Sequence, residues 1–179
     1  MKSIKHIVLS ALVTISAFGA VVYTSCNKDA CKNVVCQNGG TCSGGNCKCT
    51  PGYEGNNCEL LSQTKFTSKT WTASDKAVST GVAIPTYVAT ITAGAGVTDV
   101  LIGTFSGKTS SGTSYFVNDV KGTIGQDGLT VTIASQAPDS DGYTVSGTGT
   151  YNEATKQITW SYTLGDPTGA TISYTGTWQ

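Results

Sequence analysis

Beyond residue 59 the chain alternates between threonine or serine and large apolar residues in a series of short segments. This period of two is typical of half-buried antiparallel strands, which place one set of side chains in a core and the other in water. The segments lie at 66–72, 88–92, 100–105, 115–120, 129–133, 143–151, 158–164 and 172–178. The pattern therefore predicts a mainly β domain of about eight strands over residues 60–179.

Turn-forming residues separate these segments, at 94–96, 110–112, 126–128, 141–142, 152–153 and 166–167. Short connections favour pairing between neighbours in sequence, so we expect an antiparallel meander that forms a closed barrel or a sandwich. Trp71 in the first strand and Trp178 in the last would pack where these strands meet. Gly147, Gly149 and Gly176 share the face of the neighbouring aromatic residues, as tight curvature or close backbone approach requires.

A different pattern precedes this domain, with six cysteines spaced C-x4-C-x5-C-x4-C-x-C-x8-C from Cys31 to Cys58. So short a segment cannot bury enough apolar surface to fold alone, and we expect disulfides to replace the core. Six cysteines allow 15 pairings, and spacing excludes only an unstrained bridge between Cys47 and Cys49. A zinc site is the competing interpretation, but the segment has no C-x2-C spacing and no nearby histidine.

Residues 36–42 (CQNGGTC) and 47–58 (CKCTPGYEGNNC) resemble an epidermal growth factor-like module. The resemblance covers residues 31–59 and implies three bridges and a small two-stranded hairpin. The implied bridges are Cys31–Cys42, Cys36–Cys47 and Cys49–Cys58. Some members of that family bind calcium ahead of the first cysteine, where this chain has Asn27, Lys28, Asp29 and Ala30. Because calcium needs six to eight oxygen ligands, we expect a solvated linker here and no metal site.

Residues 1–25 have the features of an export signal, with Lys2 and Lys5 ahead of an apolar run from residue 7 to residue 22. A membrane-spanning helix is the alternative, although this run is short for a span. Cys26 is the odd cysteine left after six are paired, and it follows the small residue Ser25. This site resembles the lipobox of bacterial lipoproteins, which implies cleavage before Cys26 and acylation of that cysteine, for example with palmitate.

The predicted destination is therefore the outer membrane, with the N-terminal lipid as the membrane contact. Residues 26–30 would form the lipidated cysteine and a short linker. Lys28 followed by Asp29 is similar to the surface-export signal of Bacteroidota lipoproteins, so display on the cell surface competes with retention on the periplasmic side. A secreted protein with a free or intermolecular thiol at Cys26 is the other interpretation.

Composition excludes several classes of function. Charged residues make up 12 % of the chain, the formal net charge is zero and arginine is absent, so the basic surface that nucleic acid binding needs is missing. The one histidine, His6, lies in the predicted signal, so no serine in the mature chain has a histidine base. We predict no enzyme activity, no catalytic residues, no cofactor and no metal. The turn at residues 139–142 (DSDG) is expected to be a plain solvated turn.

The second domain also resembles the lipocalin-like and calycin-like domains of Bacteroidota lipoproteins. The shared features are a tryptophan in the first strand, residues 147–152 (GTGTYN) and residues 175–178 (TGTW). Such domains enclose ligands, so aromatic and apolar residues of the last strands are candidates for a pocket. These are Val145, Tyr151, Trp160, Tyr162, Tyr174 and Trp178. Packing as ordinary core is the competing role, and we expect it to prevail.

Two functions follow from these observations. The favoured one is a non-enzymatic, lipid-anchored envelope protein that acts as a binding module for a protein or a glycan. The alternative is a carrier that encloses a small apolar ligand in its barrel. The sequence names neither the ligand nor the oligomeric state.

Overall fold

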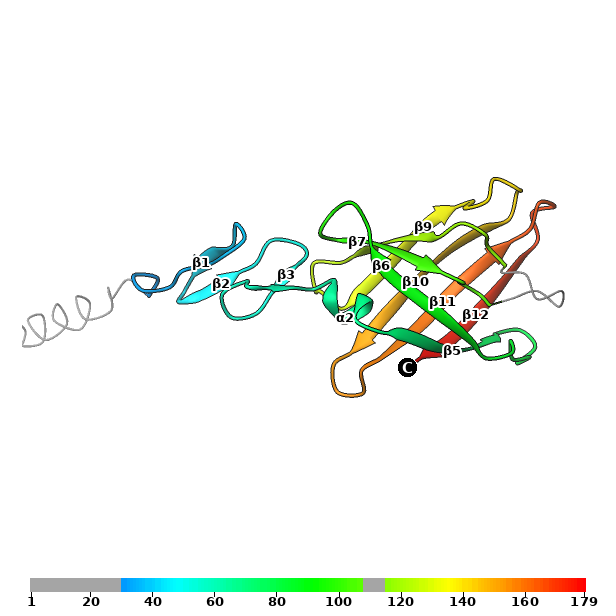
Figure 1. Ribbon diagram of the computed structural model, residues 1–179, viewed down its shortest axis with the longest axis horizontal. Coiled ribbons are helices and arrows are strands. Elements are labelled where there is room, and N and C mark those ends of the chain that lie inside the picture. Colours follow the sequence, from blue (N-terminus) through cyan, green and yellow to red (C-terminus); the bar gives the residue numbers. More distant parts are fainter. Residues whose placement is uncertain (1–29, 108–114) are drawn as a thin grey trace, which may run out of the picture.

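The structure is a computed structural model that describes residues 30–107 and 115–179. The predicted signal peptide and Cys26 lie outside the described residues. A small disulfide-rich module forms one end of the molecule and a β-barrel forms the other (Figure 1). The last strand of the barrel pairs with the first, so the chain ends at the barrel wall beside its first strand.

The disulfide module, residues 30–61, consists of two short antiparallel pairs. β1 (Thr41–Ser43) pairs with β2 (Asn46–Lys48), and β3 (Tyr53–Glu54) pairs with β4 (Leu60–Leu61). Gly44 and Gly45 have positive φ angles at the turn of the first hairpin, which suits residues without a Cβ. Three disulfides join Cys31 to Cys42, Cys36 to Cys47 and Cys49 to Cys58. These are the pairs and the hairpin that the resemblance implied.

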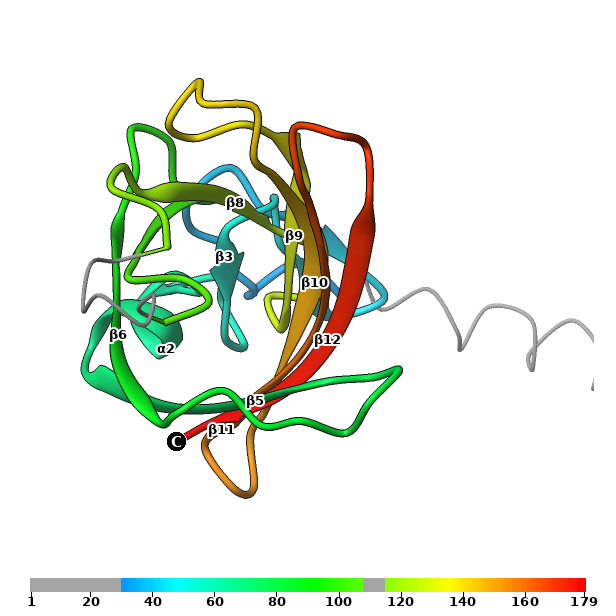
Figure 2. The ribbon, with the colours of Figure 1, turned by 90° about the vertical axis from the view of Figure 1, so that its right-hand side faces the viewer.

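Eight antiparallel strands close into a barrel, which excludes the sandwich. Each strand pairs with its neighbours in sequence, and β12 pairs with β5 to complete the ring (Figure 2). The strands are β5 (Thr70–Ala77), β6 (Tyr87–Ala93), β7 (Asp99–Gly103), β8 (Val120–Ile124), β9 (Thr130–Gln136), β10 (Thr144–Asn152), β11 (Gln157–Gly165) and β12 (Thr171–Trp178). Closure removes the free sheet edges that would otherwise invite pairing with other chains.

Burial alternates along much of the barrel, as the sequence pattern predicted, and most regularly in β5 and β8. In β5 every second residue is buried, from Trp71 to Ala77, and the residues between them are exposed. The inward residues form one cluster of apolar side chains. Gly149 leaves room for the ring of Trp160 in this cluster, because a Cβ at Gly149 would lie 2.7 Å from that ring.

The predicted positions of three strands need correction. The first strand begins at Thr70, because residues Thr64–Thr67 form a short helical turn, α2, that buries Phe66. The fourth begins at Val120, where the prediction ended, and Tyr115 and Phe116 lie in the loop before it. The predicted strand at 100–105 also ends early, at Gly103.

Phe105 explains the early end of β7. Thr104 and Ser106 both have positive φ angles, so the alternation stops and the chain turns inward. The Phe105 ring is fully buried and lies 5.4 Å from Trp160 and 4.8 Å from Tyr162, measured between ring centroids. A loop residue therefore completes the barrel core.

The barrel has two distinct ends. The near end, at loops 94–98, 125–129 and 153–156, faces the disulfide module and is covered by α2. The far end comprises the described loops 78–86, 104–107, 115–119, 137–143 and 166–170. The axis of the molecule thus runs from the N-terminal module to the far end.

Candidate functional site

The six residues predicted to line a pocket are brought together, but as packed core. Val145, Tyr151, Trp160, Tyr162 and Trp178 are buried members of the core cluster, and Tyr174 packs against it. Trp160 lies 5.1 Å from Trp178 between ring centroids, and Tyr162 stacks on Tyr174 at 5.2 Å. These contacts, together with Phe105, occupy the middle of the barrel with side chains.

Trp71 and Trp178, in the first and last strands of the barrel, pack against different residues. The pairing of β12 with β5 places Trp178 opposite Ala73. The ring of Trp178 contacts Tyr87, Phe105 and Trp160. Trp71 instead packs edge-on against Tyr151, and its indole donates to the carbonyl of Phe66 at 2.8 Å. Each tryptophan thereby connects a terminal strand to a different part of the core.

A buried carboxylate lies inside the barrel, which the sequence reasoning missed. Asp75 is 2 % exposed, and no cation lies beside it within the described residues. Tyr87 and Tyr162 donate hydrogen bonds to its Oδ2 at 2.6 and 2.8 Å, and Trp178 Nε1 donates to Oδ1 at 3.1 Å. Three donors from three strands therefore satisfy this carboxylate.

The tyrosines around Asp75 are held in the neutral form. Burial and the adjacent Asp75 carboxylate raise the pKa of Tyr87 and of Tyr162 far above the ordinary value. The Ser106 amide donates to Tyr87 Oη at 3.1 Å. The Ser106 hydroxyl lies 3.3 Å from Tyr162 Oη and donates to it, because the one phenolic proton of Tyr162 goes to Asp75. Asp75, Tyr162, Ser106 and Tyr87 thus form a ring of hydrogen bonds, which stabilises the barrel interior.

One signal in the sequence could have located this network. Asp75 shares the inward phase of β5 with Trp71, Ala73 and Ala77, so its position inside a barrel follows from the alternation. The position opposite Asp75 requires glycine, because a Cβ at Gly176 would overlap the Asp75 carboxylate. An acid in phase with apolar residues requires buried donors, and tyrosine and tryptophan supply them.

Open hollows lie on the outside of the barrel and at its far end. A hollow of about 630 Å³ is lined mainly by hydroxyl side chains of β5, β11 and β12, among them Ser74, Thr159, Thr175 and Thr177. A second, of about 320 Å³, lies at the far end and is mostly aliphatic. Its wall includes Ala77, Val82, Ile84, Ile172 and Tyr174. Tyr174 is thus the one predicted pocket residue that reaches an open hollow described here.

The acidic turn at 139–142 holds neighbouring backbone. Asp139 accepts hydrogen bonds from the amides of Val117 and Asn118 at 2.8 and 2.7 Å. Slight burial raises its pKa, but these bonds lower the pKa more, so the net shift is downward. Asp141 accepts from the amide of Tyr143 at 3.0 Å. Among residues 30–107 and 115–179, no group of three or more histidine, cysteine, aspartate or glutamate residues could hold a metal.

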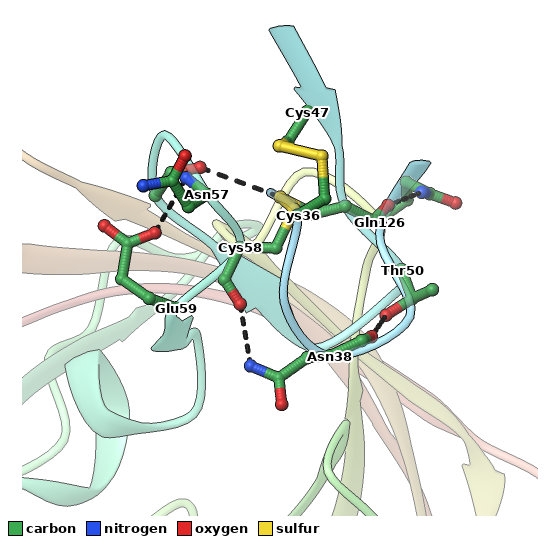
Figure 3. Close-up of a disulfide and its surroundings, with 10 residues drawn as sticks. Cys36, Asn38, Cys47, Thr50, Asn57, Cys58, Glu59 and Gln126 are labelled. Carbon is green, nitrogen blue, oxygen red and sulfur yellow. Dashed lines mark hydrogen bonds between the residues drawn. A yellow bond between two sulfur atoms is a disulfide. The ribbon is translucent and has the colours of Figure 1, made fainter. Parts of the chain in front are cut away.

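Hydrogen bonds hold the loops of the disulfide module together, and one hydrogen bond described here joins the module to the barrel. Around the Cys36–Cys47 bridge, Asn38 donates to the Cys58 carbonyl at 2.7 Å, and Thr50 donates to the Asn38 carbonyl at 2.8 Å (Figure 3). Gln126, from the near end of the barrel, donates to the Cys49 carbonyl at 3.3 Å. The module therefore continues into the barrel without a free linker.

Lys65 of α2 joins both parts as well. Its ammonium lies 2.5 Å from Glu54 of the module and 2.7 Å from Glu153 of the barrel. Partial burial lowers its pKa, but the bonds to Glu153 and Glu54 raise it more, so the pKa is raised overall.

In the part of the chain that the structure describes, no helix is long and apolar enough to cross a membrane.

Comparison with known proteins identifies no family. No protein-family model matches the sequence, and no curated protein matches it. Among solved structures, a crystal structure of a protein of unknown function from Bacteroides ovatus is similar, with 17 % identity and a TM-score of 0.40. The match covers 61 % of this chain and 40 % of that one. The chain therefore spans less than half the length of that protein.

Proposed function

We propose that this chain is a non-enzymatic, lipid-anchored envelope protein whose barrel is a binding module for another macromolecule. In this proposal the acyl chains on Cys26 hold the protein in the outer membrane. The disulfide module, an epidermal growth factor-like domain, then acts as a rigid spacer. The barrel is carried outermost, with its far end directed away from the membrane.

The observation that carries the proposal is the order of the parts along the molecule. The described chain starts at the outer end of the disulfide module, and the barrel lies at the other end (Figure 1). Gln126 and Lys65 fix the module to the barrel, so this order is built into the structure. An attachment point just before residue 30 would therefore place the far end as distant from the membrane as the chain allows.

The filled interior favours contact at the surface over ligand carriage. Trp160, Trp178, Tyr162 and Phe105 pack against one another where a carrier would hold its ligand. Because cores are packed as densely as organic crystals, opening a cavity there would require several rings to move together. A barrel filled in this way has its hollows outside, as found for the two described above.

The anchor is tested by the mass of protein made in the original host. The expected product begins at Cys26 and carries acyl chains, and Cys26→Ala should release the protein from the membrane fraction. Protease treatment of intact cells then distinguishes surface display, in which the barrel is cut, from retention inside. An unprocessed N-terminus would contradict the anchor.

The binding role is tested by photo-crosslinking of the full chain in host cells. A crosslinker at Val82, on the far end, should give discrete adducts of higher mass, whereas one at Val97, on the near end, should not. Native mass spectrometry of the same protein should find no bound small molecule. A tightly held apolar ligand would instead favour the carrier.

A further inference from the structure

Exposed apolar side chains gather at the far end of the barrel. Nine large hydrophobic residues are exposed in the described chain, and five of them lie there. They are Val78, Val82, Val117, Tyr143 and Ile172. Val82 is 65 % exposed and Ile172 is 48 % exposed, and both line the hollow of about 320 Å³. Grouped exposed apolar residues of this kind mark interaction sites on soluble domains.

Aromatic side chains lie at the same end of the barrel as this hollow. Tyr174 lines the hollow and stacks on Tyr162 beneath it. Tyr115 lies beside Tyr143 at 5.7 Å between ring centroids. Burial raises the pKa of Tyr115, and the phenols of Tyr143 and Tyr174 contribute in the same direction. The far end thus presents a mixed aliphatic and aromatic floor.

Carboxylates lie in the loops of the same end, and these acidic loops are called the rim below. The described far-end loops contain Asp119, Asp139, Asp141 and Asp166 and no lysine, and Lys108 lies outside the described residues. Asp166 accepts hydrogen bonds from Thr168 and the Ala170 amide, and the Thr168 hydroxyl in particular lowers its pKa. Asp166 and Asp139 therefore remain ionised well below neutral pH, and the rim is negative at the pH of the cell surface.

We propose that the far end binds a polypeptide segment in which an aliphatic or aromatic side chain is flanked by lysine or arginine. The apolar side chain would enter the hollow between Val82 and Ile172. The flanking cations would meet the carboxylates of the rim, which provides charge complementarity and faster association. This inference rests on the proposed binding function and assigns its surface and the chemistry of the partner.

Other occupants fit the surface less well. A glycan would need an exposed aromatic face, whereas the wall of the hollow is mostly aliphatic, with Ser79 and Thr80 as its hydroxyl residues. Its one aromatic ring, Tyr174, is stacked on Tyr162. A second copy of the chain would bring two acidic rims together, and like charges across an interface cost affinity. The basic, apolar polypeptide is the occupant that satisfies both the floor and the rim.

The test pans a random peptide display library against the full chain purified in detergent. Peptides enriched over the bare support should combine a large apolar residue with neighbouring lysine or arginine. The double variant Val82→Ser/Ile172→Ser should bind them about tenfold more weakly, as expected when apolar anchors are lost. Val35→Ser, which changes an exposed valine of the disulfide module, is the matched control and should bind like the wild type.

The rim is tested separately with Asp119→Asn/Asp141→Asn, which keeps the side-chain shapes. Association should slow several-fold and depend less on salt, because steering acts through charge and Asp139 and Asp166 remain. Unchanged thermal transitions of all variants would show that the barrel is intact. These readouts separate the apolar anchor from the electrostatic contribution.

Four results would overturn the inference. The first is no enrichment over the support. The second is equal binding by the serine variant, and the third is binding that is insensitive to both salt and the asparagine variant. The fourth is self-association of the wild type that the serine variant removes. Failure of the proposed function is distinguishable, because Cys26 acylation and crosslinking at Val82 in host cells are measured independently of the peptides.

Discussion

The disulfide module and the barrel are stabilised by different interactions. In residues 30–59 only Gly52 and Cys58 are buried, and three disulfides link segments 9 to 11 residues apart. The barrel has no cysteine and buries an apolar cluster to which every strand contributes. The module therefore depends on the redox state of its surroundings, whereas the barrel depends on packing.

This difference bears on where each part can fold. The module becomes stable only after oxidation, in a compartment where disulfides form. Closure of the barrel pairs β5 with β12, which lie about a hundred residues apart in sequence, as the register of Ala73 with Trp178 shows. Polar contacts at the near end then join two parts that are stabilised independently.

The largest expected effect comes from reduction of the three bridges. Each should contribute about 2–4 kcal/mol, so full reduction should unfold the module. Hydrogen exchange should show loss of protection in residues 31–58 and retained protection in β5 to β12, because the barrel core contains no disulfide. Loss of protection in both parts would mean that they share one cooperative unit.

The converse experiment removes packing from the barrel. Trp160→Ala should lower the free energy of unfolding of the barrel by about 3–5 kcal/mol, because the ring is fully buried among Phe105 and Trp178. The three disulfides should form as before, as thiol counting would show. Val88→Ala, at an exposed position, is the control and should change stability by less than about 0.5 kcal/mol.

The buried hydrogen-bond centre gives a smaller effect. Asp75→Asn keeps the size of the side chain but replaces an acceptor, so at least one of the three donors loses its partner. Denaturant unfolding should show a loss of about 1–3 kcal/mol. Asp119→Asn, an exposed matched change, should be nearly neutral. Equal stability of both variants would mean that the carboxylate contributes nothing specific.

Alkaline pH should destabilise the barrel through the same centre. Tyr87 and Tyr162 keep their protons when folded, because burial and Asp75 raise each pKa, but both ionise near pH 10 once the chain unfolds. Their contribution is complete below about pH 10 and decreases as pH rises above it, by up to about 1.4 kcal/mol per pH unit for each tyrosine. Tyr87→Phe should reduce this slope, and an unchanged slope would contradict the assignment.

The smallest expected effect concerns the junction. Lys65→Met removes the bridges to Glu54 and Glu153 and should cost less than about 1 kcal/mol, because these groups are partly exposed. NMR relaxation should nevertheless show more independent motion of the module. Lys156→Met loses its exposed bond to Glu153 and its position over the Tyr151 ring, both within the barrel, and should leave that motion unchanged.

Local pattern predicted much of this fold because strand periodicity and turn residues act over a few positions. The alternation in β5 and the other strands places each side chain on its face before any partner is known. Local rules failed where the chain leaves this period. The alternation predicted that Phe66 and Phe105 lie in strands. Phe66 instead lies in α2, and Phe105 lies in a loop between two residues with positive φ. Both rings are needed to fill a space that only the closed barrel creates.

The candidate site divides in the same way. The inward direction of Trp160, Tyr162 and Trp178 was predictable and core packing was their expected role, but which rings contact one another was not. Asp75 could be placed inside from its phase, yet its donors come from β6, β11 and β12. The far-end surface also escaped prediction, because the loops that form it are distant in sequence.

By itself the sequence determined the division into a cysteine-rich segment and a β domain, the number of strands and the side of each strand that faces the core. These properties follow from spacing and periodicity within short windows. The tertiary structure decided that the sheet closes, that the interior is filled and that apolar and acidic loops meet at the far end. Those outcomes depend on the simultaneous packing of distant segments, whose geometry no local pattern contains.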